Sequence, residues 1–178
     1  MSTNRSASET RRAQILELLK QADTPMTGKE IGERTGVSRQ IVVGDINLLK
    51  AVEEPIVATS RGYLYMHEYV GDGQIERIAV CQHTADQTEE ELTIFVDHGV
   101  TVKDVRVEHP VYGDLTASIM VTNRMEVKEF LEKITAANAV YLSALSEDHT
   151  HLHTVTADNV KQLDQAFEAL RKAGILVE

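Results

Sequence analysis

Two histidines separated by one residue, His151 and His153, are the residues best suited to chemistry in this 178-residue chain. In a β-strand, side chains two residues apart project from the same face, so both imidazoles could bind one ion. His83 follows another predicted strand, and Glu91 lies in the first turn of the next predicted helix, so a strand-to-helix corner could present both to one point. Three imidazoles and a carboxylate form a mixed nitrogen and oxygen set, which suits zinc, nickel or iron better than calcium.

The histidine pair also has an interpretation without a metal. Two partly exposed strand histidines can hydrogen-bond to water or to neighbouring carboxylates, and their spacing alone does not separate the two cases. His149 is expected to be a solvated loop residue, although it could compete for a metal. His98 precedes Gly99 at a predicted helix end, where a partly charged imidazole interacts favourably with the helix dipole. Cys81 lies in an apolar strand and is expected to be a buried small side chain.

A turn-forming segment, residues 109–114, joins two predicted strands. Pro110 and Gly113 have the chemistry of a hairpin loop. A turn does not obviously require His109 and Tyr112, and both could hydrogen-bond to a small planar ligand or stack on it. This segment is therefore a candidate effector-binding site.

The elements that must position these residues follow from the hydrophobic pattern of the second part of the chain. Strands are predicted at 77–81, 102–108, 114–121 and 151–156, and helices at 88–99 and 125–137. A last helix, 158–173, stops at Gly174 before a short terminal strand, 175–177. The order is βαββαβ, which favours an α+β fold: an α/β sandwich regulatory domain with helices on one side of the sheet.

The first part of the chain has the pattern of three helices and a hairpin. The first helix, from residue 9, carries apolar residues at i, i+3 and i+4 spacing: Ile15, Leu18 and Leu19. Thr27 and Glu30 have the spacing of a capping box at the start of a second helix, which Gly36 ends. A third helix follows Ser38, with Val42, Ile46 and Leu49 as its buried stripe. Residues 56–65 read as strand, Gly-containing turn and strand, so we expect an N-terminal winged helix-turn-helix.

The third helix would enter a DNA major groove and make the base contacts. Arg39 can bond two acceptors of guanine and Gln40 can pair with adenine, while Gly44 would let the backbone come close. The expected DNA-binding residues are the cap residue of this helix, four residues within it and one at the hairpin tip: Ser38, Arg39, Gln40, Val43, Gly44 and Arg61. Helix-turn-helix units also mediate protein contacts without DNA, and that alternative remains open at this point.

Charge is distributed unevenly along the chain. The net charge is -10, but residues 1–66 hold nine Lys and Arg against eight Asp and Glu, while residues 67–178 hold nine against twenty. An acidic surface repels phosphate, so the first part is expected to face double-stranded DNA. No apolar stretch approaches the roughly 18 residues needed for a membrane span, and the single cysteine forms no intrachain disulfide. We therefore expect a cytoplasmic protein with no membrane partner.

The combination resembles a known family. The residues that carry the resemblance are 36–40 and 61–63 in the first part, and His83, 109–113 and 151–154 in the second. They are similar to the nicotinate-responsive repressors of NAD-synthesis genes, bacterial proteins that pair a winged helix with a three-histidine domain. The resemblance covers the chain from about residue 9 to residue 177. The charge distribution and a polar, Gly-containing stretch before Ile75 predict a DNA-binding domain at 1–66, a linker at 67–74 and a regulatory domain at 75–178, and the resemblance implies that this last part is a three-histidine metal- and effector-binding domain.

The resemblance also implies partners and ligands. It implies repression of NAD biosynthesis or niacin salvage genes at operator DNA, nicotinic acid as co-repressor, a homodimer and a divalent metal, with nickel or zinc favoured. The implied metal ligands are His83, Glu91, His151 and His153. A metal cation would let an acidic domain accept an anionic pyridine carboxylate, and His109, Tyr112 or Arg106 is expected to hold the other end of that molecule.

Two alternatives to this function remain. One is a winged-helix repressor that senses a different small metabolite or the metal itself. The other is a metal-dependent hydrolase with an appended winged helix, because an open histidine site can activate water. The chain lacks a His-Glu-x-x-His helix, a Gly-x-Ser-x-Gly elbow and a P-loop. We therefore expect a regulator and no enzyme.

Overall fold

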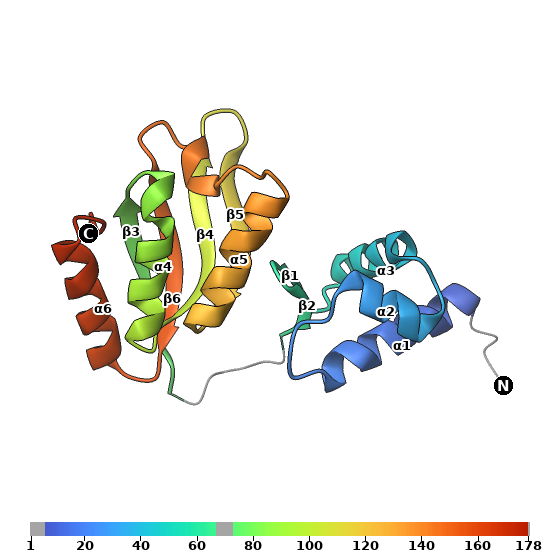
Figure 1. The fold of residues 1–178 in the computed structure, drawn as a ribbon. Helices are drawn as coiled ribbons and strands as arrows, with labels where there is room; N and C mark the ends of the chain where they lie inside the picture. The colour runs from blue at the N-terminus through green and yellow to red at the C-terminus, as the bar shows by residue number, and fades with distance from the viewer. Residues whose placement is uncertain (1–5, 67–72, 178) are drawn as a thin grey trace. The chain divides into compact units, whose positions relative to one another are not determined.

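Three helices and one hairpin form the N-terminal unit, which Figure 1 shows as a ribbon. The computed structural model describes residues 6–66 and 73–177, which belong to two compact units. The first unit contains α1 (Ala7–Gln21), α2 (Gly28–Thr35), α3 (Arg39–Ala51), β1 (Ile56–Thr59) and β2 (Gly62–Tyr65). This order confirms the predicted winged helix-turn-helix. The predicted linker, 67–74, lies outside the described residues except for its last two positions.

Side-chain caps set the helix boundaries of this unit. The Thr27 hydroxyl accepts the Glu30 amide hydrogen at 3.2 Å, and the Glu30 carboxylate accepts the Thr27 amide hydrogen at 2.7 Å. This is the predicted capping box. Ser38 caps α3 by accepting the Ile41 amide hydrogen at 3.4 Å. Gly36 ends α2 with a left-handed φ of 71°, which glycine adopts without steric cost.

The core of this unit fixes which side of α3 remains outside. The buried stripe of α3 packs with residues of α1, α2 and β1, in the cluster Ile15, Leu19, Met26, Ile31, Val42, Ile46, Leu49 and Ile56. Asp45 of α3 is also buried, and Arg11 of α1 donates to its carboxylate at 2.5 Å. Helix α3 is therefore held to α1 by apolar contacts and by an ion pair, and the opposite face of α3 is exposed.

The wing is a hairpin with a two-residue turn. Its strands β1 and β2 pair antiparallel, with Ile56 opposite Tyr65 at one end and Thr59 opposite Gly62 at the other. A backbone bridge between Met26 and Tyr63 ties it to the segment before α2. Gly62 has a φ of 139°, and a Cβ atom there would collide with the Met26 carbonyl oxygen. Gly62 is therefore required for both the turn and the close approach of the wing.

The second unit alternates strands and helices in the predicted βαββαβ order. Its strands are β3 (Ile75–Gln82), β4 (Thr101–His109), β5 (Gly113–Val121) and β6 (Thr150–Ala157). Its helices are α4 (Thr88–Asp97), α5 (Arg124–Ala136) and α6 (Val160–Lys172), with 3-10 turns η1 (Ala85–Gln87) and η2 (Leu142–Leu145). The sheet order is β3-β6-β4-β5, with every neighbouring pair antiparallel. The α+β prediction is confirmed.

The three α-helices of this unit cover one face of the sheet (Figure 1). Alternate strand residues point into the layer between sheet and helices, where the core includes Ala79, Val102, Ile119 and Val155. His151 and His153 alternate with Leu152 and Thr154 along β6 and are buried with this core. The helix-covered face is therefore the one that can hold a closed site.

Three parts of the pattern were not predicted correctly. The terminal segment 175–177 forms only an isolated bridge, between Leu176 and Cys81, because three residues are too short to extend a strand ladder. Turns η1 and η2 were not predicted, since a single 3-10 turn has no periodic apolar signal. Within residues 6–66 and 73–177, no helix combines the length and the apolar character that crossing a membrane requires.

Candidate metal centre

Glu91 lies at the centre of a buried cluster of three histidines. Its carboxylate oxygens are 2.8 Å from His83 Nε2, 3.1 Å from His151 Nε2 and 3.2 Å from His153 Nε2. The side chains of all four residues are at most 3% exposed. The predicted ligand set is thus brought together in space, and the four side chains converge through their ring nitrogens and one carboxylate.

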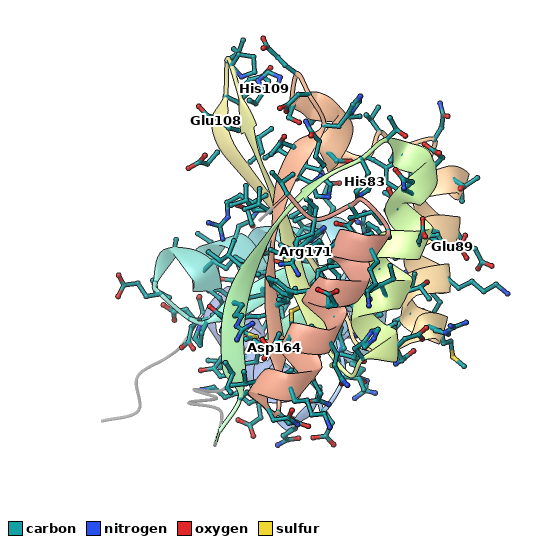
Figure 2. All side chains as sticks on the ribbon, turned by 90° about the vertical axis from the view of Figure 1, so that its left-hand side faces the viewer. His83, Glu89, Glu108, His109, Asp164 and Arg171 are labelled. Carbon is teal, nitrogen blue, oxygen red and sulfur yellow. The ribbon has the colours of Figure 1, made fainter. Side chains whose placement is uncertain are left out.

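Three separate segments contribute to the cluster. His151 and His153 point inward from β6, beside Cys81 and Ala79 on the neighbouring strand β3. His83 follows the last residue of β3, and the chain then turns through η1 into α4, where Glu91 lies in the first turn. Figure 2 labels His83 beside α4. The strand-to-helix corner expected from the sequence is the feature that delivers His83 and Glu91 to the same point.

The second ring nitrogen of each histidine contacts a backbone carbonyl oxygen. These contacts are His83 Nδ1 to Thr84 at 2.8 Å, His151 Nδ1 to His149 at 2.9 Å and His153 Nδ1 to Asp104 at 2.6 Å. A carbonyl oxygen only accepts, so each Nδ1 carries the hydrogen, and Nε2 of a neutral ring then presents a lone pair inward. Metal-binding histidines are held in this way.

A bulge in β4 supplies the carbonyl that holds His153. The register of β4 against β5 shifts between Val102 and Asp104. The Asp104 carbonyl oxygen accepts from His153, and the Asp104 carboxylate accepts the Thr154 amide hydrogen at 3.0 Å. Bulges redirect strand groups at functional sites, and this one redirects a carbonyl toward a candidate ligand.

The electrostatics of the cluster favour ionised Glu91. Burial by itself would raise the pKa of Glu91, but without a metal the charge of His153 and hydrogen bonds from His151, His153 and His83 outweigh burial, and the pKa of Glu91 lies well below its ordinary value. Burial by itself would lower the pKa of His83 and of His153, but Glu91 outweighs it and both pKa values are raised. Burial and the nearby Glu91 charge raise the pKa of the Cys81 thiol, so Cys81 remains a neutral thiol.

The residues fit a divalent transition cation. If every Nε2 donated a hydrogen to Glu91, three buried imidazolium ions would share one carboxylate, which is a costly arrangement. His153 Nε2 also lacks the alignment of a hydrogen bond and has no such partner among the described residues. Three neutral imidazole nitrogens and one carboxylate avoid that excess charge and match the ligand set of zinc or nickel. His83, Glu91 and His151 place ligand atoms within 4.8 Å of one another.

A pocket of about 160 Å³ opens onto this cluster. Its polar end is formed by Thr88, Glu91, His151 and His153. Its apolar walls are formed by residues of β4, β5 and α5, namely Val105, Ala117, Ile119, Phe130 and Ile134. The segment at η2 adds Val140, Tyr141, Leu142 and Ser143. These residues could not be found from the sequence because no motif links them; helical spacing, as between Thr88 and Glu91 on α4, is the signal that some of them carry.

The residues predicted to bind the effector do not line this pocket. Arg106 donates to the Thr154 hydroxyl at 3.2 Å, and Thr154 alternates with His153 along β6, so Arg106 faces the opposite side of the sheet. Figure 2 shows His109 at the tip of the β4–β5 hairpin. Tyr112 is 74% exposed there, and its ring lies 4.8 Å from that of His109. The prediction that these three residues hold the other end of a metal-bound ligand therefore lacks geometric support.

His109 has a structural role that the sequence did not reveal. Its Nδ1 atom accepts the amide hydrogens of Val111 at 3.1 Å and Tyr112 at 3.2 Å. His109 therefore contributes to the turn itself, because its imidazole satisfies two backbone donors there.

His149 adopts a left-handed backbone conformation, with φ of 62°, immediately before the histidine pair. It serves the cluster through its carbonyl oxygen, so its side chain is not needed there. We expect His149→Gly to keep metal binding and to raise the free energy of unfolding by up to about 1 kcal/mol, because glycine tolerates this conformation. Thermal melting measures the stability and metal analysis measures the metal content. Loss of metal would show that the His149 imidazole is itself a metal ligand.

The structure places the predicted DNA-binding residues on the outer side of the first unit. Ser38 caps α3, and Arg39 and Gln40 are exposed in its first turn. Gln40, Val43 and Gly44 have the i, i+3, i+4 spacing of one helix face, opposite the buried stripe. Arg61 lies in the two-residue turn of the wing and is half-buried. Helical spacing therefore places Gln40, Val43 and Gly44 next to one another on the same face of α3.

Comparison with known proteins defines the class. A family model described as an HTH domain matches residues 11–64, and one described as a 3H domain matches residues 76–178. The chain is 53% identical over 169 residues to Transcription repressor NadR of Bacillus subtilis (strain 168), covering 94% of this chain and 93% of the relative. It is 34% identical over 164 residues to Probable transcription repressor NiaR of Thermotoga maritima, covering 92% and 91%.

An HTH unit followed by a 3H domain is the architecture of a DNA-binding transcription regulator, and DNA is the partner of such a unit. This chain belongs to the NadR/NiaR family of transcription repressors. The family membership identifies a regulator and not an enzyme, which removes the hydrolase alternative. The resemblance found in the sequence is therefore confirmed at the level of the family and its fold.

Proposed function

We propose that this protein represses NAD biosynthesis or niacin salvage genes as a homodimer, with nicotinic acid as co-repressor and a bound divalent metal, nickel or zinc. In this proposal residues 1–66 bind operator DNA, 67–74 link the two parts, and 75–178 bind metal and effector. The names of the two repressor relatives and the buried ligand cluster support the proposal. We place the effector in the pocket beside Glu91 rather than at the 109–114 hairpin.

The observation that carries the proposal is the size and position of the pocket. A cavity of about 150 Å³ holds a single benzene ring. At about 160 Å³, this pocket has room for one six-membered ring and few additional atoms. Because it is apolar on one side and ends at the metal-ligand cluster on the other, it suits a flat molecule with one polar end.

The charge of the co-repressor requires a positive partner. Within the described residues, the pocket lining contains no Lys or Arg and includes the carboxylate of Glu91. A bound metal would supply the positive charge and a coordination position for the carboxylate or ring nitrogen of nicotinic acid. The protein itself supplies the apolar walls, which exclude water and strengthen that attraction.

Repression requires that the ligand favour one arrangement of the dimer. A ligand with equal affinity for all arrangements changes no equilibrium. We infer that nicotinic acid favours the dimer in which two α3 helices match major-groove half-sites about one helical turn apart.

Isothermal titration tests this function. Nicotinic acid is titrated into metal-loaded and into chelator-stripped full-length protein, with nicotinamide as the control ligand. We expect nicotinic acid to bind only the metal-loaded form and to increase the affinity of that form for DNA upstream of niacin genes. DNA binding that responds to metal but not to nicotinic acid would instead favour the metal as effector. Absence of nicotinic acid binding in both forms would contradict the proposed effector.

Gly44 provides a separate test of the DNA interface. A Cβ atom added to Gly44 meets nothing within 4 Å, so the fold itself does not require glycine in the middle of α3. We expect Gly44→Ala to raise the free energy of unfolding by about 1 kcal/mol, because alanine is the better helix former. It should also weaken operator binding, since the added methyl group separates the backbone from the base edges. Unchanged affinity in a gel-shift or anisotropy titration would remove Gly44 from the interface.

A further inference from the structure

Thr88, the first residue of α4, presents a buried hydroxyl group with no hydrogen-bond partner. The residue is 7% exposed and lines the pocket beside the ligand cluster. Within residues 6–66 and 73–177, its Oγ1 atom finds no donor or acceptor. Buried hydroxyl groups are normally hydrogen-bonded, so an orphan on the wall of a pocket indicates a partner that enters the pocket.

The local backbone explains why the Thr88 hydroxyl has no hydrogen-bond partner. Helical threonines often donate to the carbonyl oxygen four residues earlier, as Thr35 does to Ile31 at 2.7 Å. For Thr88 that carbonyl belongs to Thr84, and it already accepts from His83 Nδ1 at 2.8 Å and from the Gln87 amide at 3.1 Å. The bond that holds a candidate metal ligand therefore removes the usual acceptor of the Thr88 hydroxyl.

The direction of Thr88 follows from its spacing on α4. Thr88 and Glu91 are three residues apart, so they lie on the same helix face, and both line the polar end of the pocket with His151 and His153. The facing walls are apolar. A ligand that places its ring against those walls brings its polar end to the side where the hydroxyl lies.

We propose that the Thr88 hydroxyl donates a hydrogen bond to the carboxylate of a single-ring aromatic acid bound in this pocket. The inference rests on the proposed function, because it takes such an acid as the occupant. A hydrogen bond from a hydroxyl to a carboxylate is charge-assisted and is stronger than one to a neutral amide oxygen. Thr88 thus contributes to selection of the acid over the corresponding amide.

The predicted consequence is a loss of effector affinity without a loss of metal. Thr88→Val keeps the shape of the side chain and removes the hydroxyl. Because the hydroxyl bonds to nothing in the described protein, the variant should bind metal at the wild-type ratio and should melt no lower than the wild type. Its affinity for nicotinic acid should fall about 10- to 100-fold, the range expected for a hydrogen bond to a charged group.

The experiment is calorimetric titration of nicotinic acid and of nicotinamide into the metal-loaded full-length wild type and four variants. Thr88→Ser retains the hydroxyl and should stay near wild-type affinity, while Thr88→Ala should lose affinity as Thr88→Val does. Thr93→Val is the matched control, since Thr93 lies on the same helix and does not line the pocket. Metal content and melting temperature are measured for every variant.

The outcomes separate this inference from the proposed function. Wild-type affinity in Thr88→Val and Thr88→Ala, with metal retained, would overturn the role of Thr88 and leave the function intact. Loss of metal in those variants would show that Thr88 supports the ligand cluster instead, which also overturns the inference. Absence of nicotinic acid binding by the metal-loaded wild type would overturn both proposals.

Discussion

Replacement of Glu91 by glutamine is expected to reduce metal affinity by at least about 100-fold, more than removal of an outer hydrogen-bond partner of a metal ligand typically costs. Glu91 contacts all three histidine Nε2 atoms and is the only carboxylate in the described cluster. Glutamine is nearly the same size but is neutral, so the cluster would have to hold a dication with neutral groups alone. Metal analysis after dialysis measures the loss, and Co²⁺ absorption reports the geometry of the ligand set.

Glu90→Gln is the matched control. Glu90 is the neighbouring carboxylate on α4 but is exposed, so its replacement removes the same charge outside the cluster. The control should keep wild-type metal content, and circular dichroism should show that both variants retain their helices. If Glu91→Gln bound metal as tightly as Glu90→Gln, Glu91 would not be a metal ligand.

Replacement of Arg39 by alanine is expected to weaken operator binding by about 1 to 3 kcal/mol, which is about 5- to 150-fold at 25 °C. Arg39 is exposed in the first turn of α3, the end of a recognition helix that contacts base edges. The loss should be large for the operator and small for unrelated DNA, because a base contact carries sequence information and a phosphate contact does not.

Lys161→Ala controls for the lost charge, since Lys161 is an exposed cation of α6 in the other unit. Fluorescence anisotropy at several salt concentrations measures both variants. An equal loss for operator and unrelated DNA in Arg39→Ala would assign Arg39 to phosphate. An affinity like that of Lys161→Ala would remove Arg39 from the interface.

The local elements of this protein were predictable because their signals are periodic or short in range. The capping box at Thr27 and Glu30 and the stop at Gly36 involve residues within one turn of each other. The inward direction of both His151 and His153 follows from strand alternation alone. These features depend on neighbouring residues, so any fold that contains the elements retains them.

The members of the ligand cluster were named from the sequence, but their convergence depends on strand pairing. Cys81 pairs with His151 across β3 and β6, which sets the position of His83 relative to the histidine pair. A shift of one residue in that register would turn the paired side chains to opposite faces. The sequence gives no direct measure of that register, so the distances to Glu91 came from the structure alone.

The effector prediction shows the limit of sequence reasoning most clearly. Arg106, His109 and Tyr112 were chosen from the sequence because their side chains could hold a small anionic ring, yet Arg106 lies on the far face of the sheet and the other two lie in the hairpin. A strand residue's face changes with every step and with every bulge, and β4 contains a bulge. Side-chain chemistry alone therefore does not establish proximity to the metal ligands.

The class of fold, the winged helix, and the residue types and strand face of the histidine pair could all be predicted from the sequence, because they depend on local spacing. Only the packed structure shows which carbonyl holds each imidazole, where the ring-sized pocket lies and why the Thr88 hydroxyl has no hydrogen-bond partner. Each of these depends on the packing of α4 and α5 against a particular register of the sheet, and such packing joins residues that share no sequence pattern.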